Sequence, residues 1–187
     1  MSDPIELPSR RMTVEDYLPW AEAQPHGRFE LCDGQVVAMA PERAGHARAK
    51  MAAALALRQA IHAAGLPCEA FMDGIGVRVD EATVYEPDAV VSCGPRMAAE
   101  DMLARNPVVV VEVTCPTNSR VDLTTKLADY FRIPSVQHYL VVHLAKRLVL
   151  HHRRGASGEI ATRMLPDGVL DLDPPGLTLR VEDLFEA

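Results

Sequence analysis

Long apolar runs are missing from this sequence of 187 residues. The longest span residues 51–57 and 108–113, far below the roughly 18 residues that a transmembrane helix needs. The opening stretch, MSDPIELPSRR, has no apolar segment behind a basic head, so the sequence predicts no signal peptide. We therefore expect a cytoplasmic protein without a membrane partner.

Cysteine is scarce, and its spacing excludes two kinds of site. The four cysteines are Cys32, Cys68, Cys93 and Cys115, and no two of them form a C-x-x-C pair. This spacing argues against a thiol zinc site and against a redox dithiol. Scattered buried thiols in a reducing compartment are the simpler interpretation.

The sequence also lacks an excess of basic residues. Nineteen Lys and Arg stand against 26 Asp and Glu, which gives a formal net charge of −7. A chain with this net charge is not expected to bind nucleic acid through its overall charge alone. The same charge is compatible with an enzyme acting on nucleic acid whose acidic site is neutralised by a metal ion. The motifs G-x-S-x-G, G-x-x-x-x-G-K-[ST] and H-E-x-x-H are absent, which argues against their associated chemistries.

What is present indicates one folded domain over residues 1–187. Forty-eight per cent of the residues are apolar, enough for a sizeable core at this length. We find neither a repeat nor a proline-rich linker. Residues 1–25 are expected to form an N-terminal helical segment, and residues 156–187 a C-terminal extension of strands and a short helix.

The local patterns predict helices and strands in irregular alternation. Thr13 and Asp16 form a capping box that opens a short helix, Asp33-Gly34 is a hairpin turn, and Gly65 ends a long helix. Together they indicate an α/β fold in which helices flank a central mixed β-sheet. The predicted helices cover residues 13–23, 44–64 and 121–132, and the predicted strands cover 28–32, 35–39, 68–72, 75–79, 88–92, 108–113, 136–142 and 148–152, with weaker strands in 159–172.

The residue that most suggests chemistry is Glu112. It follows four consecutive valines, and a carboxylate in a buried strand is costly unless a cation or several donors meet it. A strand end half in water, or a structural pair with an arginine, would also explain it. We favour a functional role.

Asp88 is the second candidate carboxylate. It follows Pro87 at the beginning of an apolar strand, where a turn residue would be ordinary. With Glu112 on a neighbouring strand, however, it could bind Mg²⁺, which takes one or two carboxylates with waters and substrate phosphate. The main-chain carbonyl of Val113 could complete the coordination shell.

Lys126 is the third candidate. Asp122, Lys126 and Tyr130 recur every four residues and share the polar face of their predicted helix. A lysine there could approach Glu112 and orient a water or offset phosphate charge. An ordinary Asp–Lys surface pair is the alternative.

Three further features have two interpretations each from the sequence. Glu30 alternates with apolar neighbours as a surface strand residue would, yet it could line a cleft as a supporting or metal-binding carboxylate. His46 is either solvated or a phosphate contact. The basic run 146–154 fits a nucleic-acid contact and equally an edge strand protected by charge. We do not expect His151-His152 to bind zinc, because adjacent strand residues point to opposite faces.

The order Glu30, Pro87-Asp88, Glu112-Val113 and Asp122-x-x-x-Lys126-x-x-x-Tyr130 resembles the Uma-two restriction-endonuclease family, a branch of the PD-(D/E)XK nucleases. The resemblance spans about residues 12–155 and includes Arg28-Phe-Glu-Leu-Cys-Asp-Gly34. It implies a restriction-endonuclease-like core, and that Lys126 replaces the lysine such nucleases often carry at the position of Thr114. After Glu-Val the family usually has Ser-Pro-Ser-Thr, where this chain has Cys115-Pro116-Thr117-Asn118. The strand after the predicted helix 121–132 also differs from the family pattern. This chain has Tyr139 to His143 where the family commonly has an aromatic-rich end followed by an aspartate.

These residues lead to the hypothesis of a Mg²⁺- or Mn²⁺-dependent endonuclease acting on DNA. Asp88, Glu112 and Val113 would bind the ion, Lys126 would position the attacking water, and Glu30 would orient Lys126 or bind a second ion. Asp122 and Tyr130 would only support the helix. A homodimer is expected, because two sites cut a duplex most easily. The alternatives are a nucleic-acid-binding or interaction protein that keeps the fold without cutting, and a dimeric domain whose buried acids are structural.

Overall fold

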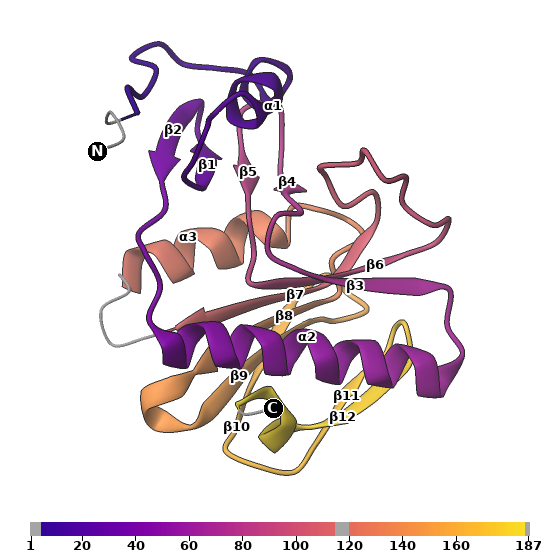
Figure 1. The fold of residues 1–187 in the computed structure, drawn as a ribbon. Helices are drawn as coiled ribbons and strands as arrows, with labels where there is room; N and C mark the ends of the chain where they lie inside the picture. Colours follow the sequence, from indigo (N-terminus) through magenta and orange to yellow (C-terminus); the bar gives the residue numbers. More distant parts are fainter. Residues whose placement is uncertain (1–4, 115–119, 186–187) are drawn as a thin grey trace.

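The computed structural model describes residues 5–114 and 120–185, and the side chains of residues 120–122 fall outside this description. Figure 1 shows the arrangement of the elements. The helices are α1 (Val14–Glu22), α2 (Ala44–Ala64) and α3 (Arg120–Tyr130), with 3-10 turns η1 (Leu144–Lys146) and η2 (Val181–Leu184). The strands are β1 (Phe29–Cys32), β2 (Gln35–Ala38), β3 (Cys68–Met72), β4 (Val77–Arg78), β5 (Val84–Tyr85), β6 (Ala89–Cys93), β7 (Pro107–Thr114), β8 (His138–His143), β9 (Leu148–Arg154), β10 (Ile160–Leu165), β11 (Val169–Leu172) and β12 (Leu177–Arg180).

A six-stranded sheet forms the centre of the molecule. Its strand order is β10-β9-β8-β7-β6-β3, and β7 and β8 pair in parallel whereas the other neighbours are antiparallel. The parallel pair is joined through α3, as parallel strands need a long crossover. This mixed sheet between helices confirms the predicted α/β class.

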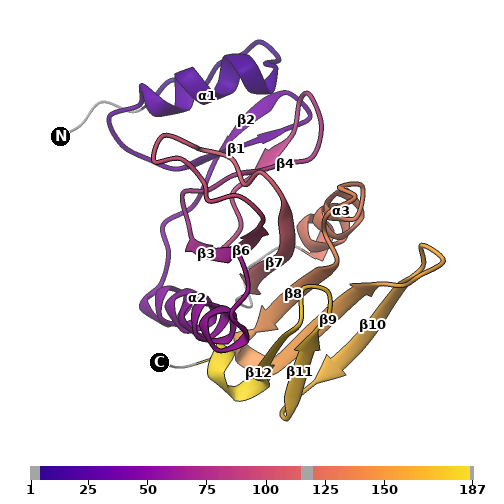
Figure 2. The same ribbon diagram turned by 90° about the vertical axis from the view of Figure 1, so that its right-hand side faces the viewer.

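The two longer helices cover opposite faces of this sheet (Figure 2). Every residue of β7 is buried, as its run of valines predicts. Val109 and Val111 belong to the core on the α2 side, whereas Val110 packs in the core that includes Tyr130 of α3. Since side chains alternate along a strand, Glu112 points to the α3 side with Val110.

A smaller sheet, with strand order β2-β1-β5-β4, lies beside the main one and carries α1. The predicted hairpin is present, and its turn residues Asp33 and Gly34 have φ of 47° and 77°. Thr13 caps α1 by accepting from the backbone N–H of Asp16. The hydroxyl of Tyr17 donates to the carbonyl of Phe29 at 2.6 Å, which ties α1 to β1 and thereby fixes the strand that carries Glu30.

The C-terminal segment packs on the main core. Strand β10 extends the large sheet, and β11 and β12 form a separate hairpin. Apolar residues of this hairpin and of η2 join the cluster of α2: Leu170, Leu172, Leu177, Leu179 and Leu184. Among the residues that the structure describes, no helix is both long enough and apolar enough to span a bilayer.

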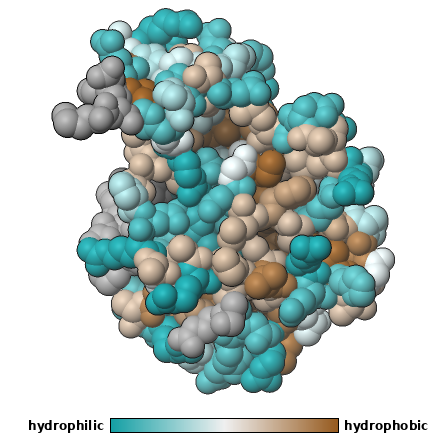
Figure 3. All heavy atoms as spheres, viewed as in Figure 1, coloured by the Kyte–Doolittle hydropathy of each residue, from teal (hydrophilic) through white to brown (hydrophobic). Residues whose placement is uncertain are grey.

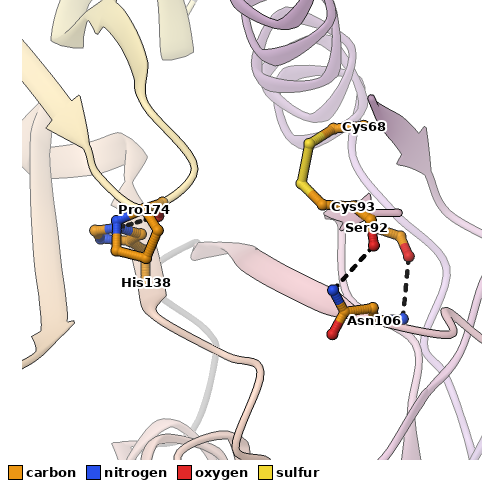
Figure 4. The surroundings of a disulfide bond; sticks show 6 residues. All are labelled: Cys68, Ser92, Cys93, Asn106, His138 and Pro174. Carbon is orange, nitrogen blue, oxygen red and sulfur yellow. Dashed lines mark hydrogen bonds between the residues drawn. A yellow bond between two sulfur atoms is a disulfide. The ribbon is translucent and has the colours of Figure 1, made fainter. Parts of the chain in front are cut away.

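The expectation of scattered thiols is wrong for two cysteines. Cys68 and Cys93 lie directly opposite each other on β3 and β6, and they form a disulfide (Figure 4). Residues opposite each other on antiparallel strands have adjacent Cβ atoms, and this pairing depends on strand register rather than on sequence spacing. The cytoplasmic location, which relied partly on reduced thiols, stays a prediction.

Asn106 holds the same end of β6 from the other side. Its backbone N–H donates to Ser92 Oγ at 3.2 Å, and its side-chain amide donates to the carbonyl of Cys93 at 2.9 Å (Figure 4). The end of β6 remote from Asp88 is thus fixed by a covalent bond and by two hydrogen bonds.

We predict that reduction of the disulfide destabilises the protein by about 2–4 kcal/mol, because the reduced unfolded chain regains conformational freedom. Urea unfolding with and without dithiothreitol measures the effect. In the double variant Cys68→Ala and Cys93→Ala, dithiothreitol should leave the unfolding midpoint unchanged. An equal response of the variant and the parent protein would contradict the prediction.

Candidate active site

Two carboxylates meet where β6 begins and β7 ends. The antiparallel register sets Ala89 opposite Val111, so Asp88 lies beside the end of β7 that carries Glu112 and Val113. Asp88 Oδ2 accepts a hydrogen bond from the backbone N–H of Val113 at 2.6 Å. Asp88 and Glu112 are 4% and 9% exposed, so neither is a solvated surface residue.

Lys126 reaches this place from α3. Its Nζ lies 3.0 Å from Glu112 Oε1 and 2.9 Å from Glu30 Oε1. The amine is also 5.0 Å from the centre of the Tyr85 ring. Lys126 is buried, which excludes the simple surface pair. The structure therefore brings Glu30, Glu112 and Lys126 into one hydrogen-bonded group.

Glu30 comes to the group from β1 of the small sheet. Its Oε1 accepts from the backbone N–H of Glu86 at 2.9 Å in addition to Lys126. Although the alternation around Glu30 is ordinary for a surface strand, the residue is buried. The packing of the small sheet against α3, which the strand pattern does not encode, decides its environment.

Tyr130 takes a larger part than a support for the helix. It is fully buried, and its hydroxyl donates to Glu112 Oε1 at 2.8 Å. One turn of α3 separates it from Lys126, so both residues hold the same carboxylate oxygen. The side chain of Asp122 and the departure at Cys115 to Asn118 lie outside the described residues.

The pKa values of the two buried carboxyl groups shift in opposite directions. For Glu112, burial raises the pKa to about 7, opposed by the positive charge of Lys126 and reinforced by the nearby carboxylates. For Asp88, burial alone would raise the pKa, but hydrogen bonds from His46 and the Val113 amide, with the charge of Lys50, lower it below its ordinary value. Asp88 is thus ionised, whereas Glu112 is held near its protonation midpoint at neutral pH.

Sequence reasoning missed a second group around Lys50 of α2. This lysine is 1% exposed, and its Nζ contacts Glu42, Asp73 at 2.5 Å and Asp88 Oδ1 at 3.4 Å. The signal was available in the helix pattern, since Lys50 shares the buried alanine face of α2. A charge on such a face needs partners.

His46 and Arg28 complete the second group. His46 Nε2 lies 3.3 Å from Asp88 Oδ1, so this histidine is neither simply solvated nor remote from the site. Arg28 contacts Glu42 and Asp73, each at 2.8 Å, and Glu86 at 2.7 Å. Asp88 therefore links the two groups, and Glu86 links them as well, because its backbone N–H donates to Glu30 and its side chain contacts Arg28.

The basic run 146–154 does not reach this site in the described contacts. Arg154 donates to the backbone carbonyls of Val136, Phe131 and Ile133, which assigns it a structural part. His151 bonds His138, whereas His152 bonds Thr162. As expected for neighbours on a strand, the two imidazoles have separate partners.

A hollow lies next to the second group. Figure 3 shows it between the part of the molecule that carries α1 and the part that carries α2, with hydrophilic side chains beside it. Its volume is about 450 Å³, and Leu18, Phe29 and Leu103 contribute apolar lining whereas Arg28 and Asp73 are polar. The second group therefore adjoins an open depression in the surface, whereas Asp88, Glu112 and Lys126 are not among its lining residues.

The donor atoms present fit a divalent cation. Carboxylate oxygens of Asp88 and Glu112 are the hard ligands that Mg²⁺ and Mn²⁺ prefer. In addition, ligand atoms of Glu42, His46 and Asp88 all lie within 4.8 Å of one another. Glu112, whose ionised form burial disfavours, would be neutralised by a bound cation.

Comparisons with known proteins show the family of the chain and support its fold. A sequence profile of the Uma2 family, described as "Putative restriction endonuclease", matches residues 14–182. A curated protein of Synechocystis sp. PCC 6803, "Uncharacterized protein slr1290", is 26% identical over 180 residues, which cover 95% of this chain and 93% of that protein. The crystal structure of a "putative nuclease belonging to DUF820" from Anabaena variabilis superposes with a TM-score of 0.72 at 16% identity, covering 93% of this chain and 97% of that one.

We predict that Glu112→Gln stabilises the metal-free protein more at pH 8 than at pH 5. Because the folded-state pKa of Glu112 exceeds the unfolded one, the native protein retains a proton that the unfolded chain releases. The free energy of unfolding therefore falls as pH rises from about 4.5 to about 7, and the glutamine variant escapes this loss, which is on the order of 1–3 kcal/mol.

Urea unfolding in EDTA at the two pH values measures the difference. Glu100→Gln is the matched control, because Glu100 is exposed and its substitution should have the same small effect at both values. If the Glu112 variant gained no more at pH 8 than at pH 5, the pKa assigned to Glu112 would be wrong.

Proposed function

Because the chain belongs to the Uma2 family, we propose that it is a Mg²⁺- or Mn²⁺-dependent endonuclease that hydrolyses phosphodiester bonds in DNA. The observation that carries the proposal is the convergence of Glu112, Lys126 and Asp88 from three separate elements at one end of the main sheet. Burying these charges costs free energy unless they are paired. Their arrangement is more than a stable core requires.

The ion would be held by Asp88, Glu112 and the main-chain carbonyl of Val113. A divalent ion bound there lowers the pKa of a coordinated water and neutralises charge on the scissile phosphate. The hydrogen bond from the Val113 amide to Asp88 Oδ2 fixes the orientation of that carboxylate. Tyr130 does the same for Glu112 through Oε1.

Lys126 would interact with the attacking water or with the substrate. Its ammonium hydrogen-bonds to Glu30 and Glu112. In the complex with substrate, the same positive charge would stabilise the attacking water or a phosphate oxygen, whose negative charge grows in the transition state. Glu30 positions Lys126, since it holds the amine from the side opposite α3.

DNA is the proposed partner although the chain is acidic. The substrate would be retained through the ion and through local cations rather than through the net charge of −7. A homodimer remains our expectation, because two sites related by symmetry can cut both strands of a duplex.

We predict that Glu112→Gln lowers Mg²⁺-dependent DNA cleavage at least about 10²-fold, because the ion loses a charged ligand. Nicking of a supercoiled plasmid, with and without EDTA, measures the effect. Glu100→Gln is the control and should cleave like the parent protein.

Two outcomes would overturn the catalytic assignment. One is cleavage that survives Glu112→Gln undiminished. The other is a folded parent protein that binds DNA but leaves it intact under all divalent ions tried, which would favour the non-cleaving nucleic-acid-binding alternative.

We predict that Lys126→Met lowers cleavage at least about 10²-fold, while affinity for an uncleaved DNA duplex in Ca²⁺ changes little. Loss of the adjacent ammonium should also raise the pKa of Glu112, so residual activity should require higher pH. Fluorescence anisotropy and a pH–rate profile test both effects. The exposed Lys146, changed to Met, serves as control, and a shift of the profile to lower pH would contradict the assigned role.

A further inference from the structure

We propose that the hollow beside α1 binds one unpaired base of a DNA strand, and that Glu86 selects bases that present an amino group to it. This inference rests on the proposed function, since it names the kind of DNA that the nuclease would take. The binding of the base itself is argued from the residues that line the hollow.

The hollow has the size and the walls of a site for a flat organic group (Figure 3). Its volume of about 450 Å³ lies in the range of small-molecule sites in proteins. Its walls come from α1, β1, β3, β5 and the segment before β7. Unpaired bases bury their faces against such apolar and aromatic surface. The apolar lining side chains are those of Leu18, Phe29, Met72, Val84, Met102 and Leu103.

The charge of the lining disfavours a phosphate and admits a base. Three carboxylates and one guanidinium line the hollow, those of Glu22, Asp73, Glu86 and Arg28. The guanidinium already contacts Asp73 at 2.8 Å and Glu86 at 2.7 Å, so its charge is compensated. A further negative group would be repelled, whereas a neutral ring with N–H groups on its edge meets acceptors.

Glu86 supplies an acceptor in a fixed orientation. Its Oε1 accepts from Arg28 Nε at 2.9 Å and from the backbone N–H of Gly74 at 2.7 Å. Toward the described residues, the side-chain bonds of Glu86 all use Oε1, so Oε2 keeps its acceptor capacity for a ligand. A carboxylate accepts from the amino group of cytosine, whereas thymine presents a carbonyl oxygen at the same position. Glu86 therefore favours amino-bearing bases.

The hollow lies next to the groups that we assign to cleavage, without containing them. The backbone N–H of Glu86 donates to Glu30, which holds Lys126 at 2.9 Å. The ammonium of Lys50 likewise contacts both Asp73, which lines the hollow, and Asp88. One residue thus separates the lining from Lys126, and one separates it from Asp88. A strand whose phosphate reaches these groups can place a neighbouring base in the hollow.

A base in the hollow is neither stacked nor paired within DNA. The protein takes up its faces and its amino group, so the nucleotide is single-stranded or extruded from a duplex. Single strands and mismatches supply such a base at the lowest cost, because no regular pair has to be broken. DNA with unpaired, amino-bearing bases is therefore the substrate class of this site.

Cytosine and thymine are the matched probes, because they are similar in size and differ in the group that they present to Glu86. Fluorescence anisotropy measures the affinity for oligo-dC and oligo-dT of equal length, in Ca²⁺ and at mildly alkaline pH, where cytosine is neutral. We expect the parent protein to bind oligo-dC at least about fivefold tighter, the effect of one discriminating contact. Glu100→Gln is the control, because Glu100 is exposed and does not line the hollow.

Glu86→Gln should reverse this preference. The N–H donors at Oε1 keep the amide oxygen there, so the amide nitrogen takes the place of Oε2 and donates to the carbonyl of thymine. We expect oligo-dT then to bind tighter than oligo-dC. Circular dichroism melts establish that the variant is folded.

A second variant fills the hollow. Ala21 lines it from α1, and Ala21→Phe adds a ring where the base would lie. We expect both affinities to fall at least about fivefold, the effect of one lost stacking contact, and the difference between them to disappear. Should this variant not fold, the response of Glu86→Gln decides.

Three results would overturn the inference. They are equal affinity of the parent protein for the two oligonucleotides, no binding of either, and a cytosine preference that survives in folded Glu86→Gln. The last would mean that the base is recognised elsewhere.

Binding and cleavage are measured separately, so this inference and the proposed function can fail independently. A cytosine preference that Glu86→Gln abolishes or reverses, in a protein that leaves DNA intact under every divalent ion tried, would support the base site and overturn the nuclease. Mg²⁺-dependent cleavage by a protein without such a preference would do the reverse.

Discussion

The carboxylate of Glu112 inside a strand of valines is the constraint around which the rest of the structure is arranged. A charge at this position is tolerated only where donors reach it, and Lys126 and Tyr130 of α3 both do so at hydrogen-bond distance. The connection from β7 through α3 to β8 is what places those donors over the strand. The small sheet then closes the group, because Glu30 of β1 holds the same ammonium. The fold thus keeps a costly charge in a fixed position.

Asp88 connects this group with the cluster that α2 brings to the other side. One of its oxygens receives the amide of β7, and the other faces His46 and Lys50. Consequently α2, α3, both sheets and the segment after β3 all contribute charged groups near one sheet end. The remote end of β6 is fixed by the disulfide to β3 and by Asn106, so the strand that Asp88 precedes is held firmly.

Cysteine pairing shows why some features escape a single sequence. The spacing of Cys68 and Cys93 matches no cysteine motif, and only the register of β3 against β6 makes them partners. Lys50 illustrates a different failure, because its position on the alanine face of α2 was visible, whereas its partners Glu42, Asp73 and Asp88 come from segments far apart in the chain. Likewise Tyr130 looked like a helix support until the packing of α3 on β7 gave its hydroxyl a partner.

The sequence by itself determined the local structure and the identity of the candidate carboxylates. Capping at Thr13, the turn at Asp33-Gly34 and the end of α2 at Gly65 depend on short-range backbone preferences, and the valine run of β7 specifies burial through hydrophobicity alone. Only the tertiary structure decided which charges meet, because contacts between Glu30 and Lys126, or between His46 and Asp88, depend on how distant elements pack. Burial and the pKa of Glu112 follow from those contacts, and so they too belong to the folded molecule rather than to the sequence.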